Sequence, residues 1–155
     1  MTAARGRLRD ASPYLLAALL TGAGVLHFTA TDRYAQIIPA VFPQSTHRPL
    51  VQASGVAELA CAALLALPRT RRVGGLATIA LLVAVFPANV KMALDGGLTG
   101  AGFPLGSPVV AWLRLPLQVP LIAWAASCSV RSQRTPDVRG VRSGPGLHPD
   151  PDRGR

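Results

Sequence analysis

The stretch LVQASGVAELACAALLALPRTRR, residues 50–72, decides the fold class of this chain. Residues 50–67 are almost entirely apolar, and a helix needs about 20 residues, at 1.5 Å per residue, to cross the hydrocarbon core of a bilayer. A basic turn follows directly. Glu58 is the only charged residue between Arg48 and Arg69. The pattern predicts a membrane-spanning helix that carries one carboxylate.

The composition of the whole chain agrees with a membrane location. Half of its 155 residues are hydrophobic and only 15% are charged, which is too apolar for an ordinary soluble domain. The net charge of +9 comes from arginines that bracket apolar runs, as the positive-inside rule describes, so it indicates orientation and not nucleic-acid binding. These arginines are Arg5, Arg7 and Arg9, then Arg69, Arg71 and Arg72, then Arg131, Arg134, Arg139 and Arg142.

Three further apolar runs complete the predicted architecture. Backbone polar groups must be satisfied within lipid, so each run is expected to be a helix. The prediction is an all-α membrane protein, a four-transmembrane-helix bundle over residues 11–130. Its spans are residues 11–30, 50–67, 73–94 and 108–130.

The segments outside the spans set the predicted orientation. Residues 1–10 are basic, and residues 131–155 form a tail rich in Pro, Gly and charge that we expect to be disordered. Four spans place both ends and the Arg-rich turn on one side, which the positive-inside rule makes cytoplasmic. The connections 31–49 and 95–107 then face outward. A cleaved signal peptide is the alternative for the first run, but its removal would leave an odd number of spans.

The first outward connection contains an amphipathic segment. DRYAQIIPAVFP, residues 32–43, is too short to span and carries apolar residues at helical spacing. Such a segment is typical of an interfacial helix or a re-entrant turn that caps the bundle. We therefore predict an interfacial segment between helices 1 and 2. Its apolar residues are Tyr34, Ile37, Ile38, Val41 and Phe42.

Polar residues in the four spans gather at one depth. Counted along the predicted helices, they fall in the outer half of the bilayer, whereas the inner half has nothing comparable. A charged residue at such depth costs about 2.5–3.5 kcal/mol or more when it has no partner. Together they are the candidate ligand-binding residues: His27, Glu58, Asn89, Arg114 and Gln118.

Partners within this set can be argued from charge and helical facing. Arg114 is the expected direct or water-bridged partner of Glu58, because a guanidinium stays charged and its planar fork matches a carboxylate. Asn89 and Lys91 lie on different faces of one helix, so Asn89 is expected to point inward and Lys91 toward the surface. Pro87 frees the carbonyl of Val83 for a neighbouring side chain.

Small residues flank the carboxylate on its helix. Ser54, Glu58 and Cys61 share one helical face, and Gly55 and Ala62 beside them favour the close approach of another helix.

The sequence does not favour metal or thiol chemistry. The predicted spans contain one His and one Glu, without an HxxxH or ExxH pattern, so the sequence predicts no metal site there. Cys61 and Cys128 have no CxxC partner and are expected to be small buried apolar side chains.

Five segments of the chain stand out together, in this order: GVLHF (24–28), IIPAVFP (37–43), SGVAELACAALLALPRTRR (54–72), LLVAVFPANVKMAL (81–94) and WLRLPLQVPLIAWA (112–125). They resemble the DoxX-like family of small bacterial four-helix integral membrane proteins, and the resemblance covers most of residues 20–126. It implies a location in the bacterial inner (plasma) membrane. Some relatives are linked to thiosulfate oxidation with quinone as acceptor, or to membrane redox complexes with soluble partners.

Two functions follow as hypotheses, and whether the chain is an enzyme stays open. In the first, it is a redox- or quinone-associated membrane subunit, with quinone as the expected ligand and a redox partner that supplies electrons. In the second, it is a non-catalytic scaffold whose polar cluster only fixes helix packing. A permease is a weaker third hypothesis, because four helices are few and no inverted repeat is visible. The expected partners are the lipid bilayer, a redox protein and a second copy of the chain.

Overall fold

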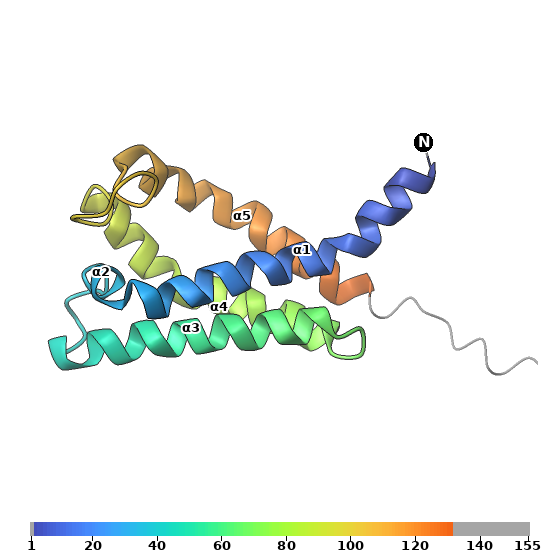
Figure 1. Ribbon diagram of the computed structural model, residues 1–155, viewed down its shortest axis with the longest axis horizontal. Helices are drawn as coiled ribbons and strands as arrows, with labels where there is room; N and C mark the ends of the chain where they lie inside the picture. The colour runs from blue at the N-terminus through green and yellow to red at the C-terminus, as the bar shows by residue number, and fades with distance from the viewer. Residues whose placement is uncertain (1, 132–155) are drawn as a thin grey trace, which may run out of the picture.

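The computed structural model describes the backbone of residues 2–131 and the side chains of residues 11–130. Within that part, all regular elements are helices. The long helices are α1 (Thr2–Thr29), α3 (Gln44–Ala66), α4 (Arg71–Leu94) and α5 (Pro108–Arg131), and a short helix α2 (Thr31–Ala35) follows α1 (Figure 1). The predicted four-helix architecture is confirmed. The predicted tail lies outside the described residues except for Arg131.

Each long helix contains a segment that is long and apolar enough to span a bilayer. The second of these segments, in α3, begins at Gln44, six residues before the predicted start. The polar residues at its beginning lower the local hydropathy, which hid them from the prediction, but they do not prevent a helix. Pro43 precedes α3 with an extended backbone. Pro49 lies in the second turn of α3, where its missing N–H removes one backbone hydrogen bond. The four segments are Ala11–Thr29, Gln44–Ala66, Arg71–Leu94 and Pro108–Val130.

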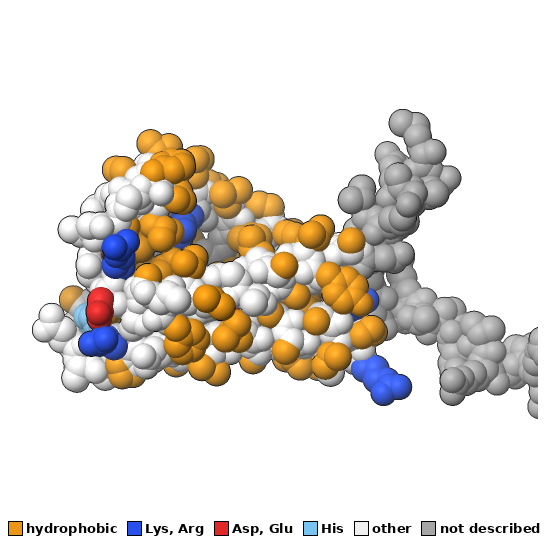
Figure 2. All heavy atoms as spheres, in the orientation of Figure 1, with side chains coloured by type: hydrophobic (Ala, Val, Ile, Leu, Met, Phe, Trp, Pro, Cys, Tyr) orange, Lys and Arg blue, Asp and Glu red, His pale blue; other side chains and the backbone are white. Residues whose placement is uncertain are grey.

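The surface of the bundle is apolar along its length. Large hydrophobic side chains on all four long helices are exposed, among them Leu15, Val56, Val83 and Leu117. Figure 2 shows hydrophobic side chains along the bundle and charged side chains gathered toward its two ends. An apolar belt between charged ends is the surface expected of a protein that sits in a bilayer.

The helices form two pairs that are joined at one end. α1 packs along α3 and α4 packs along α5, while α3 and α4 connect the pairs. We call the end with residues 67–72 the basic end, and the end with α2 and residues 95–107 the α2 end. At the basic end, the Trp124 indole Nε1 donates to Ser12 Oγ at 2.7 Å, and the Arg71 guanidinium lies 4.7 Å from the ring centroid of Tyr14.

Toward the α2 end the two pairs separate. Figure 1 shows α5 diverging from α1, and Figure 2 shows the surface hollowed between them, with a basic side chain visible in the hollow. The seam between α1 and α5 is therefore closed at the basic end and open toward the α2 end.

Buried apolar side chains form two separate clusters. One fills the basic end and includes Leu16, Leu65 and Cys128. The other fills the α2 end, where Tyr34 and Ile37 of the amphipathic segment pack with residues such as Met92. Ile38 is half-buried, whereas Val41 and Phe42 are exposed. The segment thus caps the bundle, and its position at a membrane surface stays a prediction.

Candidate functional site

Two glycines bring α1 and α3 into close contact beside the site. A Cβ atom on Gly24 would lie 3.0 Å from the carbonyl oxygen of Gly55, and a Cβ on Gly55 would lie 3.0 Å from that of Gly24. Small residues permit such an approach between membrane helices. The predicted close packing on the Gly55 face of α3 is confirmed, and the partner is α1.

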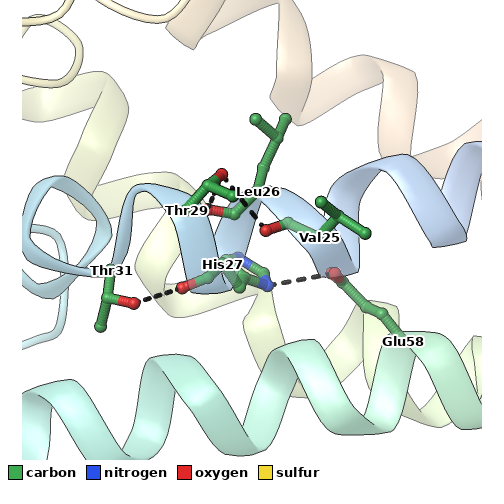
Figure 3. Close-up of polar contacts among 6 residues, drawn as sticks. All are labelled: Val25, Leu26, His27, Thr29, Thr31 and Glu58. Atoms are coloured by element: carbon green, nitrogen blue, oxygen red, sulfur yellow. Dashed lines mark hydrogen bonds and ion pairs between the residues drawn. The ribbon is translucent and has the colours of Figure 1, made fainter.

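One turn beyond this crossing, His27 meets Glu58. His27 Nδ1 and Glu58 Oε2 lie 3.1 Å apart, and their side chains are only 15% and 11% exposed. Both atoms are buried, and within the described part of the chain neither has another polar partner. Figure 3 shows the two side chains converging from α1 and α3. They form an acid–base pair shielded from solvent.

The backbone of His27 is held where α1 ends. The Thr31 hydroxyl donates to the carbonyl oxygen of His27 at 2.7 Å, and the Thr29 hydroxyl donates to that of Val25 at 3.3 Å (Figure 3). The two bonds hold the last turn of α1, and the bond from Thr31 satisfies a carbonyl that the helix end leaves free. They fix the turn from which the imidazole projects.

Tyr34 of α2 joins the pair to Arg114 of α5. The rings of Tyr34 and His27 meet edge to face, with centroids 4.6 Å apart and planes at 80°. Burial raises the pKa of the Tyr34 hydroxyl, the adjacent Arg114 guanidinium lowers it, and the Glu58 charge raises it further. Tyr34 was not among the predicted site residues. The available signal was its position in the apolar segment only seven residues after His27.

Asn89 and Gln118 make a second polar contact between α4 and α5. The Asn89 side-chain amide donates to Gln118 Oε1 at 3.4 Å, and the amide of buried Gln118 donates to the carbonyl oxygen of Leu82. The prediction that Asn89 points inward is confirmed. The carbonyl that accepts near Pro87 is that of Leu82, one residue before the predicted Val83.

The predicted direct ion pair between Glu58 and Arg114 is wrong. Glu58 contacts His27 instead, and the other ion pairs between described residues join Asp32 to Arg48 and Lys91 to Asp95. The physical reason is helix adjacency, because the glycine crossing presses α3 against α1 while α5 packs on α4. Arg114 reaches the group through Tyr34.

The five predicted residues and Tyr34 lie between, or at the edge of, the two apolar clusters. We call these six residues the polar layer: His27, Tyr34, Glu58, Asn89, Arg114 and Gln118. Along the helices, the cluster at the basic end lies on one side of them, and Tyr34 itself belongs to the cluster at the α2 end. The structure brings the predicted residues together in two neighbouring groups.

Residues 16–129 match a family model described as Domain of unknown function (DUF8561). The chain belongs to this family. The matched range includes the whole polar layer, but the description of the family assigns no activity. No curated protein and no solved structure is similar enough to match the chain.

In this DUF8561 chain, the polar layer offers a specific set of chemical groups. Arg114 and the Tyr34 hydroxyl are hydrogen-bond donors, and the His27–Glu58 pair can accept or release a proton. Among the side chains of residues 11–130, no cluster of three metal-ligating His, Cys, Asp or Glu residues occurs. The arrangement suits a ligand that has polar acceptor atoms and exchanges protons.

Proposed function

We propose that this protein is a membrane subunit that binds a quinone-type redox carrier at the polar layer. One observation carries the proposal: the shielded His27–Glu58 pair lies against the ring of Tyr34, whose hydroxyl is adjacent to Arg114 of α5. A buried acid–base pair is costly in lipid, and ionisable groups at membrane depth are characteristic of ligand and proton sites.

The chemistry of a quinone fits these groups. Its two carbonyl oxygens accept hydrogen bonds, and its reduction to a quinol takes up two electrons and two protons. Arg114 and Tyr34 would donate to a carbonyl, and the His27–Glu58 pair would hold or pass a proton. The electrons would come from a soluble or membrane redox partner.

The open part of the α1–α5 seam supports access from the bilayer. Leu26 points from α1 away from His27 and toward the side on which α5 lies (Figure 3), and its side chain is exposed. A quinone carries its polar ring on a long apolar tail. The ring would enter between α1 and α5 while the tail stayed among lipid chains.

The location completes the proposal. The DoxX-like resemblance and the distribution of arginines favour the bacterial inner membrane, with both termini cytoplasmic. In that orientation the α2 end faces outward and the polar layer lies in the outer half of the bilayer. That the chain is a member of the DoxX-like family is itself part of this proposal.

Mass spectrometry of quinones that co-purify with the detergent-solubilised protein tests the function. We expect the native chain to retain quinone and Glu58→Gln to lose most of it. Thr78→Val is the matched control, because Thr78 is buried on α4 and its hydroxyl contacts the carbonyl of Gly74 and the thiol of Cys61, neither of which belongs to the polar layer. The proposal fails if the native chain retains no quinone, or if both variants retain it equally.

A non-catalytic scaffold is the second candidate, and the glycine crossing favours it. Gly24 and Gly55 bring the helices so close that His27 and Glu58 can fix their register without any ligand. A scaffold predicts that Glu58→Gln lowers stability and leaves quinone retention at the level of the Thr78→Val control. Assembly with a second copy or a redox protein would then be the function to test.

A further inference from the structure

A second polar surface lies at the α2 end, outside the polar layer. Where α1 passes into α2, the backbone and the first turns of α3 enclose a depression of about 250 Å³. None of the polar-layer residues lines it. Its lining residues are Phe28, Thr29, Ala30, Thr31, Asp32, Arg33 and Arg48.

Two arginines give this depression a net positive charge. Arg48 Nε lies 3.1 Å from Asp32 Oδ1, and both side chains are mostly exposed. The Asp32 carboxylate lies next to Nε, and the mostly exposed guanidinium of Arg48 stays accessible to a second anion. Arg33 is exposed and makes no ion pair within that same part of the chain. Asp32 therefore orients one guanidinium without neutralising the site.

The chemistry of the lining points to a phosphate group. Arginine is suited to phosphate, because its planar donors make two parallel charge-assisted hydrogen bonds to phosphate oxygens. Exposed Phe28 lies in the same depression, and exposed Phe42 follows in the connection to α3. Apolar rings beside two arginines, at the end of two membrane-spanning segments, suit a molecule with a phosphate head and apolar chains.

We infer that the depression between α1, α2 and α3 is a phosphate site, and that its ligand is the headgroup of an anionic phospholipid. The inference is independent of the proposed function, because it uses no residue of the polar layer. The same chemistry would bind free phosphate, so the experiment must separate the two sources.

Native mass spectrometry of the detergent-solubilised full chain, titrated with phosphatidylglycerol, tests the inference. The test variant is Arg33→Gln with Arg48→Gln. The matched control is Arg69→Gln with Arg72→Gln, which removes the same charge from two exposed arginines at the basic end. We expect one tightly bound lipid on the native chain and on the control, and an affinity about tenfold or more lower in the test variant.

Competition with inorganic phosphate identifies the source. If millimolar phosphate leaves the bound phosphatidylglycerol in place, the site recognises the lipid. If it displaces the lipid and the displacement depends on Arg33 and Arg48, the site takes a free phosphate, which overturns the assignment to a lipid. Equal losses in the test and control variants would mean general charge attraction and overturn the site itself. Circular dichroism of all variants checks that the helices are intact.

Discussion

Gly24 of α1 and Gly55 of α3 approach so closely that neither position has room for a side chain. A Cβ atom on Gly55 would lie 2.9 Å from Cβ of His27 and 3.0 Å from the Gly24 carbonyl oxygen. Each glycine is followed three residues later by one member of the acid–base pair, His27 or Glu58. The crossing point therefore sets the distance between the two ionisable side chains.

Gly55→Ala should destabilise the bundle. The new methyl group would force apart two backbones that cannot shift independently, at a cost of about 1–3 kcal/mol that exceeds the helix-propensity gain of about 1 kcal/mol. We expect a lower thermal midpoint in detergent. Gly22→Ala is the control, because a Cβ there meets nothing within 4 Å, and it should leave the midpoint unchanged or raise it. Equal midpoints for the two variants would contradict the crossing.

A double-mutant cycle should find strong coupling between His27 and Glu58. Groups in direct contact couple by about 0.5–3 kcal/mol, so the combination of His27→Gln and Glu58→Gln should cost less than the sum of the single changes. The same cycle for Glu58 and Arg114 should give a smaller coupling, since no direct contact joins them. Unfolding free energies measured in one detergent provide the comparison. A larger coupling for Glu58 with Arg114 would show that the helix adjacency is different in solution.

Tyr34 should ionise at a higher pH than an ordinary tyrosine. Burial is the main cause that raises the Tyr34 pKa above its ordinary value of 10.0. Because the folded state holds this proton more tightly, the associated stability is full below pH 10.0 and is lost as the pH rises through the raised pKa. Ultraviolet difference titration should show tyrosine ionisation above pH 10.0 that Tyr34→Phe removes. A titration curve above pH 10.0 that Tyr34→Phe leaves unchanged would contradict the burial of Tyr34.

Cysteine labelling in intact cells should place the α2 end outside. Ser45 and Arg69 are both exposed but lie at opposite ends of α3. A membrane-impermeant maleimide should label Ser45→Cys, while Arg69→Cys should react only after the cells are opened. The reverse pattern would invert the topology.

The helices could be predicted from the sequence, because apolar length alone determines what can span a bilayer. The start of α3 could not, because hydropathy locates the lipid-facing part of a helix and not its first hydrogen-bonded turn. Gln44 and Ser45 are polar and still helical. The amphipathic spacing also predicted the cap at the α2 end, where Tyr34 and Ile37 are buried.

The members of the polar layer could be predicted more reliably than their partners. The rise along a helix gives the depth of Glu58 and Arg114, but it does not say which helices are neighbours. That information lay in the spacing of Gly24 to His27 and of Gly55 to Glu58, which marks two helix faces able to meet closely. Charge complementarity alone favoured Arg114 over His27 and was misleading.

The burial of Cys61 and Cys128 has a practical consequence for handling this protein. Both are free thiols inside the cluster at the basic end, and the chain has only these two cysteines. Neither can reach a thiol on another molecule while the fold is intact. Any covalent dimer seen on a non-reducing gel would therefore report unfolded chains, and the native sequence is already a suitable background for single-cysteine reporters.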